Sequence, residues 1–433
     1  MYRFSIFIIQ LLFLIIALTF IFTNPFIISL DIGNLKYSFS SNLFYIIFIA
    51  LAFVLYLVLY IFFTSRLSLG KYLLKNKYKK IEKGYLYFVD AMIAVANKDN
   101  NTAIKNHKKM TSYLKEDPSL SLLLKSEVLK IEKKFPQLKN VYEDMIKSKK
   151  TETLGYRGLM EQNLREQDYH HAFLYGEKLF ALNPNIEKLY DTLIFIAAKT
   201  KNWNQIILLS DKAFSNKIIS KNDLNENKSI GFYEIAKIKF DSDIKDALKN
   251  ILKAIELKKN FAPYVKLHLE IVVSLNDKRN LKKLIKKYWS LNPSSLLRSI
   301  ITKILNDNDL TDIKFINEII KNNASEQESK KLLIYFAIKN LKWDIARENI
   351  IGMIGSNPSK DICYFMSDIE LGENDDKQKS DAWIMRAENA KLESTWICRI
   401  TNQPQDEWSS LSKSGNYNSL VWSSPMMIRQ NSN

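Results

Sequence analysis

The side chains in this sequence best suited to hold a metal ion or a haem are its four histidines and two cysteines. His170 and His171 lie at an expected turn between two helices, and adjacent residues on a helix point to different faces, so we do not expect both to ligate one ion. His107 and His268 stand alone, and we expect both on helix surfaces. Cys363, in the stretch DICYFM, is typical of a small buried apolar residue. These residues predict no metal site.

The sequence contains none of the motifs that are typical of common enzyme classes. It has no phosphate-binding Walker loop, no glycine pattern for dinucleotides, no nucleophile elbow and no His-Glu-x-x-His zinc motif. We therefore predict a protein that is not an enzyme, with no catalytic residues and no cofactor. An enzyme without a familiar motif stays open as an alternative.

The composition limits the possible fold classes and the kinds of partner. With only 11 Gly and 9 Pro in 433 residues, the chain is predicted to be all-α. Its formal net charge of +17 could attract nucleic acid, anionic lipid or an acidic protein. No aromatic RNA-binding signature accompanies the charge, so we predict lysines spread over solvated helix faces and no nucleic-acid partner. Two cysteines cannot form a disulfide framework, which suits a reducing compartment.

An uncharged apolar run, Leu43 to Phe63, is the strongest signal for a single element. It holds 21 residues without a charge, an amide, Gly or Pro, and at about 1.5 Å per residue such a helix just spans a ~30 Å hydrocarbon core. An earlier apolar run, Phe4 to Phe22, ends at Asn24-Pro25 and could be a signal peptide. Its length, its single preceding basic residue and the lack of a small-x-small cleavage site favour a retained helix. We therefore predict a transmembrane hairpin over residues 1–63.

A basic segment, residues 64–83, is predicted to be a juxtamembrane helix. Its seven basic residues stand against one acid, whereas the linker from Thr23 to Asn42 carries one charge of each sign. The positive-inside rule then predicts that both termini are cytoplasmic, with anionic lipid beside the basic residues. A topology signal alone would explain the run. Its basic residues are Arg66, Lys71, Lys75, Lys77, Lys79, Lys80 and Lys83.

From residue 84 to residue 390 the apolar pattern is helical. It repeats after a constant number of residues, equal to the separation between Tyr156 and Tyr190. Several other positions around these tyrosines superpose at the same offset. A small or aliphatic residue early in each second helix would let the two helices of a unit pack closely, and Pro would end the unit. The repeat-packing positions predicted in this way are Ala103, Leu138, Ala172, Ile206, Ala247, Leu281 and Ala346.

This spacing resembles the tetratricopeptide repeat, a helix-turn-helix unit with small residues where its helices cross. One unit cannot bury its apolar face alone, so we expect about seven or eight degenerate units to stack into a superhelix with a concave surface. Tyr169, Trp203 and Trp343 would lie before the second helices and pack between repeats. The register is lost at residues 215–229 and 321–330, where we expect longer loops or joints.

Two apolar helices, a basic segment and the repeat core from Gly155 to Pro184 together resemble the HemY family of proteobacterial inner-membrane proteins associated with haem biosynthesis. The resemblance extends to the tail, residues 391–433, because some members end in a Trp- and Cys-rich stretch. Trp396-Ile397-Cys398 matches the start of that stretch, and Trp408 and Trp422 match later positions.

The tail departs from the family pattern at its cysteines. Thr401 replaces the second Cys of the pair, and residues 409–415 contain no Cys. A tetrahedral zinc site needs four ligands, so one cysteine without a nearby His predicts no metal in the tail. We expect Trp396, Trp408 and Trp422 to dock the tail against the last repeats by apolar burial instead.

The leading functional expectation is a non-enzymatic, membrane-anchored scaffold that holds other proteins near a bilayer. The family resemblance implies a two-pass protein of the bacterial inner membrane with its repeats in the cytoplasm. It also implies a role in late protohaem synthesis or haem handling, with ferrochelatase or other late tetrapyrrole enzymes as partners. Two alternatives stay open, a carrier that binds haem or porphyrin in the repeat groove and an envelope-assembly scaffold unrelated to haem.

Overall fold

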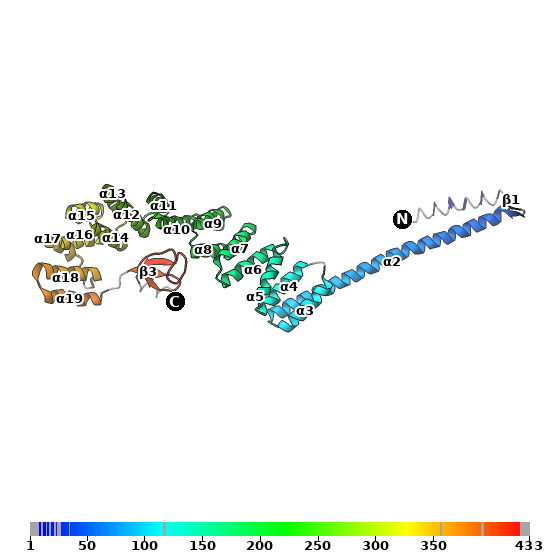
Figure 1. The fold of residues 1–433 in the computed structure, drawn as a ribbon, viewed down its shortest axis with the longest axis horizontal. Helices are drawn as coiled ribbons and strands as arrows, with labels where there is room; N and C mark the ends of the chain where they lie inside the picture. The colour runs from blue at the N-terminus through cyan, green and yellow to red at the C-terminus, as the bar shows by residue number, and fades with distance from the viewer. Residues whose placement is uncertain are drawn as a thin grey trace. The chain divides into compact units, whose positions relative to one another are not determined.

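A computed structural model describes residues 27–33, 35–115, 118–355, 357–390 and 394–424, together with isolated positions between residues 8 and 23. The chain divides into two compact units, Met1–Lys134 and Phe135–Asn433, and both are mostly helical (Figure 1). The predicted helix from Phe4 to Phe22 lies largely outside the described residues. A transmembrane pair of helices is therefore a prediction, and the described part of the chain contains one helix of the expected kind.

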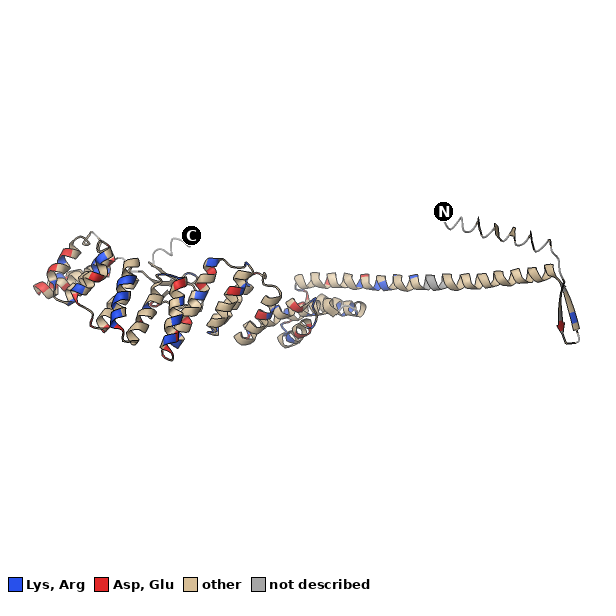
Figure 2. Cartoon of the chain, turned by 90° about the horizontal axis from the view of Figure 1, so that it is seen from above, with Lys and Arg blue, Asp and Glu red and all other residues tan. Residues whose placement is uncertain are grey.

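That helix is α2 (Ser41–Ala96), which runs without a break through the first unit. Its stretch Ser41–Thr64, with a mean hydropathy of 3.0 and no buried residues in its most apolar window, is long and apolar enough to cross a membrane. The predicted run from Leu43 to Phe63 lies within it. Basic residues gather along the middle of α2 beyond this stretch (Figure 2).

The C-terminal part of α2 packs on α3 (Asn100–Tyr113) and α4 (Pro118–Ile131). Their shared core contains Ala91 of α2, Ala103 and Met110 of α3, and Leu124 of α4. Gly84 allows α2 and the end of α3 to approach, because a Cβ at this position would lie 2.5 Å from Leu114 Cγ. The helix that carries the apolar stretch and the first packed helices therefore belong to one compact unit.

The prediction of an all-α chain is wrong in two places. Before α2, strands β1 (Ile27–Ile32) and β2 (Leu35–Ser40) form an antiparallel hairpin that turns at Gly33, whose φ is +64°. In the tail, β3 (Thr395–Cys398), β4 (Pro404–Gln405) and β5 (Leu420–Ser423) form an antiparallel sheet in the order β4-β3-β5. β3, β4 and β5, with two to four residues each, are too short to show an alternating pattern, whereas β2 does alternate between apolar and polar residues, a local signal that the composition of the whole chain does not reveal.

In the second unit, neighbouring helices form stacked pairs, among them α6/α7, α8/α9, α10/α11, α12/α13, α16/α17 and α18/α19. We call the even-numbered helices α6 to α18 the first helices and the odd-numbered helices α7 to α19 the second helices. The helices that the structure describes in this unit are α5 (Phe135–Met145), α6 (Glu152–Arg165), α7 (Tyr169–Leu182), α8 (Leu189–Lys199), α9 (Trp203–Ser215), α10 (Lys221–Lys239), α11 (Ile244–Leu257), α12 (Ala262–Ser274), α13 (Lys278–Leu291), α14 (Ser295–Asp307), α15 (Ile313–Ile320), the 3-10 turn η1 (Lys321–Asn323), α16 (Gln327–Lys339), α17 (Trp343–Ile351), α18 (Lys360–Asn374) and α19 (Lys377–Glu388).

The turns inside several pairs share one local design. The residue before the N-cap has a positive φ, and the N-cap side chain accepts a hydrogen bond from the first turn of the second helix. In α7, for example, Gln167 has a φ of +60° and the Asp168 carboxylate accepts from His171 N. The N-cap aspartates that show both features are Asp99, Asp168, Asp277 and Asp376, and Asp243 and Asp312 accept in the same way without a positive φ before them.

The seven predicted repeat-packing residues all lie at one place, the fourth residue of the helix that contains them, and all are buried. Ile316 in α15 and Ser380 in α19 are the fourth residues of two further second helices and are buried as well. The repeat pattern in the sequence did not lead us to predict either residue, although Ser380 follows Ala346 by the same offset that separates Tyr156 from Tyr190. Ser380 bonds to Ser367 of α18 at 2.8 Å between their hydroxyl oxygens.

The loops predicted at the joints are much shorter than expected. Residues 221–229 belong to α10, which begins with a capping box between Ser220 and Asp223. Between α15 and α16, η1 takes up three residues of the predicted loop. The prediction failed because the first residues of α10 are mostly polar, whether exposed or half-buried, so they carry no apolar helical periodicity.

Candidate functional site

The candidate site is the surface of the second unit onto which the tail folds. Trp408 packs edge-on against three aromatic rings, Tyr233 of α10 at 5.3 Å, Phe261 at 5.1 Å and Tyr264 of α12 at 6.0 Å between centroids. Trp396 contacts Phe261 at 6.0 Å. The predicted burial of these two tryptophans is confirmed, and both belong to the core cluster built on α10, α11 and α12.

The prediction that the tail docks against the last repeats is wrong. Its contacts lie on α10 and α12 in the middle of the array, not on α18 and α19 (Figure 1). The aromatic surface that accepts Trp408 is built there by Tyr233 and Tyr264, which stack on each other at 5.0 Å between centroids. Trp422, the third predicted docking residue, is half-buried and packs on Trp396.

Polar contacts fix the position of the tail on the array. Lys266 of α12 pairs with Glu407 at 2.8 Å. The Tyr417 hydroxyl donates to Asn227 of α10, and the Asn227 amide donates in turn to the Tyr190 hydroxyl of α8. Burial raises the pKa of Tyr190, so this phenol stays neutral and able to donate a proton of its own. The tail is therefore held by apolar burial and by specific hydrogen bonds.

Cys398 lies at the centre of the tail sheet, surrounded by hydroxyl and amide groups. Its sulfur lies 3.3 Å from Ser419 Oγ, 3.7 Å from Ser414 Oγ and 3.8 Å from Asn416 Nδ2. Burial alone would raise the pKa of Cys398, but hydrogen bonds from Ser419, Thr401 and nearby backbone amides outweigh it and lower the pKa to about 5. Among the described residues, no group of three or more His, Cys, Asp or Glu side chains could hold a metal ion.

Two hollows flank the docked tail. The first, of about 370 Å³, lies between the tail and helices α10, α12 and α14. Lys237, Glu270 and Lys303 line it from evenly spaced positions in the sequence, one on each of these three helices. Burial is the main cause that raises the pKa of Glu270, and the neighbouring lysines oppose it. The first hollow thus presents charges of both signs beside Trp396 and Trp408.

The second hollow, of about 440 Å³, lies on the other side of Trp396 and Trp408. Lys258 lines it, pairs with Glu226 at 2.8 Å and stands 4.3 Å from the centre of the Phe261 ring. Burial would raise the pKa of Glu226, but the hydrogen bonds from Lys258 and Asn418 and the charges of Lys258 and Arg399 together outweigh it and lower that pKa. Neither hollow is lined by a histidine.

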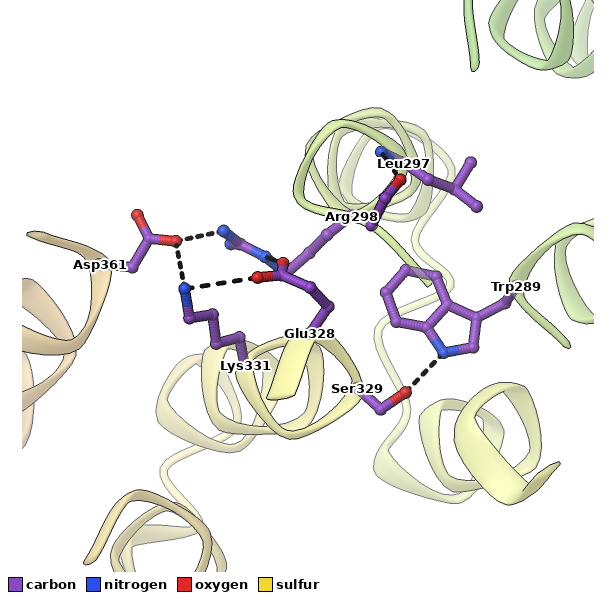
Figure 3. A network of polar contacts seen from close by, with 8 residues as sticks. Trp289, Leu297, Arg298, Glu328, Ser329, Lys331 and Asp361 are labelled. Atoms are coloured by element: carbon purple, nitrogen blue, oxygen red, sulfur yellow. Dashed lines mark hydrogen bonds and ion pairs between the residues drawn. The ribbon is translucent and has the colours of Figure 1, made fainter. Parts of the chain in front are cut away.

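Beyond the tail, an ion network joins three successive first helices (Figure 3). Arg298 of α14 pairs with Glu328 of α16 at 2.8 Å and also with Asp361 of α18. Lys331 of α16 lies 3.4 Å from Glu328 and 3.5 Å from Asp361. Two positive and two negative groups balance each other, so the network bridges repeats and offers little net charge to a ligand.

The remaining predicted residues are dispersed over both units. The side chains of Lys71, Lys75, Lys77, Lys79, Lys80 and Lys83 are exposed on α2, and the side chain of Arg66 lies outside the described residues. Cys363 is buried in α18, as predicted. Trp343 packs against α18 of the next pair, where a Cβ on Gly372 would lie 2.4 Å from its ring, which confirms its packing between repeats.

The histidines do not gather at any site. His170 and His171 lie in the first turn of α7 rather than in the preceding turn, and His171 Nδ1 lies 2.7 Å from the Asp168 carboxylate. His107 is half-buried in α3. His268 was predicted on a helix surface, and this prediction is wrong, because its ring is buried in α12 and bonds to the Tyr288 hydroxyl at 2.7 Å.

The chain is similar to tetratricopeptide-repeat proteins among solved structures. The TPR2AB domain of yeast Sti1 in complex with pHSP90 shares 11% identity, with 70% of this chain and 98% of that chain covered and a TM-score of 0.30. Yeast Tom70 shares 16% identity over 73% and 77% of the two chains, with a TM-score of 0.29. A tetratricopeptide-repeat protein from Parabacteroides merdae shares 13% identity over 57% and 92%, with a TM-score of 0.27. No family model and no curated protein matches the sequence.

Proposed function

We propose that this protein is a membrane-anchored scaffold whose helical repeats hold other proteins near a bilayer. The observation that carries the proposal is the continuity of α2, which joins the apolar stretch Ser41–Thr64 to the residues that pack on α3 and α4. Because α2 is one unbroken helix, it fixes both the distance and the orientation of α3 and α4 relative to the stretch that is proposed to span the membrane. An anchor of this kind suits a protein that confines binding to a membrane surface.

The proposed topology has two membrane passes, residues 4–22 and 43–63, in a bacterial inner membrane. The basic residues that follow the second pass support a cytoplasmic repeat array through the positive-inside rule. Stacked helical repeats offer an extended surface made of many side chains, which suits recognition of proteins rather than catalysis. The surface beside the docked tail, with its two hollows, is the part of the array that we propose as the binding site.

The pathway is proposed from the resemblance to the HemY family. It assigns the scaffold to late protohaem biosynthesis, with ferrochelatase or another late tetrapyrrole enzyme as a bound partner. Late porphyrins are apolar, so a scaffold at the membrane would keep their enzymes where the substrates dissolve. The carrier alternative draws no support from the two hollows, since no histidine lines either of them.

The test is affinity purification from membranes with the intact protein and with a version lacking residues 1–63. We expect a late tetrapyrrole enzyme to be enriched with the intact protein and to be reduced with the shortened version. Failure to recover any such enzyme with either version would contradict the pathway. Recovery of the shortened version in the membrane fraction would contradict the anchor. A stoichiometric Soret shift on adding haem to the intact protein would instead support the carrier.

A further inference from the structure

Beyond the apolar stretch, one side of α2 carries a continuous stripe of exposed side chains. Its residues follow one another at intervals of four, four, three, four, three and four, which keeps them on one side of a helix. All of them are exposed, and the three apolar members are 50% to 59% exposed. We call this set the α2 stripe, and its residues are Lys71, Lys75, Lys79, Glu82, Leu86, Val89 and Ile93.

The α2 stripe lies on the opposite side of the helix from the core of the first unit. Phe88, Ala91 and Val95 pack towards α3 and α4, and Gly84 faces Leu114. At 100° per residue, Leu86, Val89 and Ile93 lie roughly half a turn away from these core residues. The stripe is therefore surface that α2 does not need for its own packing. Its half near the apolar stretch is basic and its far half is apolar.

The lipid headgroups do not reach the outer two lysines of the basic half, Lys75 and Lys79, although both also belong to the run that a topology signal would explain. This step rests on the proposed membrane anchor. Lys75 and Lys79 follow Thr64 by 11 and 15 residues in an unbroken helix, which places them roughly 16 and 22 Å beyond the hydrocarbon boundary along the helix axis. The headgroup layer is about 5 to 7 Å deep, and the Debye length in physiological salt is about 8 Å. These lysines stand too far out to serve the lipid surface.

A second copy of this chain does not fit the stripe either. Two copies anchored in one membrane would present their α2 helices in parallel. Lys75 would then face Lys75, Lys79 would face Lys79 and Glu82 would face Glu82 of the other copy, and such like-charge contacts oppose association. A partner that binds the stripe must instead present acidic side chains to its basic half.

We propose that the α2 stripe binds an amphipathic helix of another protein, acidic where it meets Lys71, Lys75 and Lys79 and apolar where it meets Leu86, Val89 and Ile93. From Lys75 to Ile93 the intervals alternate between four and three, as in a two-helix coiled coil, in which apolar residues interdigitate and charged residues help to set the partner and the register. The stripe belongs to the first unit, whereas the tail-covered surface belongs to the second. The scaffold thus has a second binding surface next to its anchor.

The test uses the full chain in nanodiscs of neutral phosphatidylcholine and a fluorescent helical peptide of about three heptads. The peptide has Leu at the core positions of one half and Glu at those of the other, and it is made with the halves in either order. A matched peptide has Lys in place of Glu. We expect the Glu peptide to bind and the Lys peptide not to bind.

Charge reversal makes the test specific. In K75E/K79E, binding of the Glu peptide is expected to fall by about tenfold or more, and binding of the Lys peptide is expected to appear. Leu86→Ser with Ile93→Ser should abolish binding of the Glu peptide without unfolding the chain, because both side chains are exposed. The matched control is K77E/K80E, whose residues lie on the other side of α2 and should leave binding unchanged.

Equal binding of the two peptides, or no response to K75E/K79E, would overturn the stripe proposal. Self-association of the chain that depends on Leu86 and Ile93 would overturn it in favour of a second copy. Flotation of the chain with lipid is measured separately. A chain that does not float contradicts the membrane anchor, whereas the peptide titration decides the stripe, so the two failures are distinguishable.

Discussion

At the scale of single residues, the buried polar groups of the array serve its packing. His268 is enclosed in α12, where its Nδ1 lies 2.7 Å from the Tyr288 hydroxyl of α13. Trp289 of α13 donates from its indole nitrogen to Ser329 of α16 at 2.9 Å (Figure 3). Each bond satisfies a polar group that would otherwise cost free energy when it is removed from water. These contacts fix the register between successive helices.

His268 should give the second unit a stability that falls in mild acid. Burial, with a smaller contribution from the charge of Lys287, lowers the pKa of His268 to about 4, below its ordinary value near 6.5. Between these pH values the unfolded chain takes up a proton that the folded chain does not. The stabilising effect is therefore complete above pH ~6.5 and is lost as the pH falls towards ~4, at no more than about 1.4 kcal/mol per pH unit.

Urea unfolding at several pH values between 7 and 4 measures this effect. His268→Gln should lower the stability at neutral pH and flatten its dependence on pH relative to the unchanged protein. His170→Gln is the matched control, because His170 stands in the first turn of α7 outside the core, and it should keep the original slope. Identical slopes for the unchanged protein and His268→Gln would show that His268 is not the responsible group.

At the scale of helices, close approach between successive pairs depends on the side chain that each helix presents. Trp343 begins α17 and lies against Gly372 of α18, where a Cβ would come within 2.4 Å of its ring. Gly372→Ala should therefore force the two helices apart and lower the free energy of unfolding by about 1 kcal/mol or more, even though Ala favours helix more than Gly.

Gly352→Ala provides the comparison for this variant. A Cβ at Gly352 meets nothing within 4 Å, and its φ of −70° suits any residue, so this change should leave stability nearly unaltered. Thermal unfolding of both variants gives the difference directly. A Gly372→Ala variant as stable as the unchanged protein would mean that the Trp343 ring moves aside without cost.

The helix pairs could be predicted from the sequence because their packing is local and periodic. Ala172 and Ile206 occupy equivalent buried positions in successive pairs, and the offset between them also leads from Ala346 to Ser380. The helix α10 could not be predicted from its first residues, because they are mostly polar and carry no apolar period. The burial of His268 depends on Tyr288 of another helix, which the residues beside His268 do not indicate.

The candidate site was harder to predict than the repeats. The burial of Trp396 and Trp408 could be predicted, because burying a large aromatic side chain is energetically favourable. The surface on which they are buried could not be predicted, because the rings of Tyr233 and Tyr264 that contact Trp408 lie several helix pairs before the tail in the sequence. No local pattern encodes a contact over such a distance.

At the scale of the whole molecule, the chain covers part of its own repeat surface with its tail. The tail crosses the same first helices that line the two hollows, so it limits what can bind there. Any protein bound on this surface must either fit the hollows beside Trp396 and Trp408 or displace the tail. The ion pair between Lys266 and Glu407 lies at the rim of the contact, where Glu407 is largely exposed.

Trp408 should be the residue that keeps the tail in place. Trp408→Ala removes a buried ring packed on Tyr233, Phe261 and Tyr264, and such truncations cost about 3 to 5 kcal/mol in a core. Hydrogen exchange should then rise in the tail strands and at α10 and α12, while α18 and α19 keep their protection. Ile400→Ala is the control from the same tail, because its side chain is exposed and its loss should change nothing. Exchange that rises equally in every helix of the unit would mean that the tail stabilises the whole array rather than covering one surface of it.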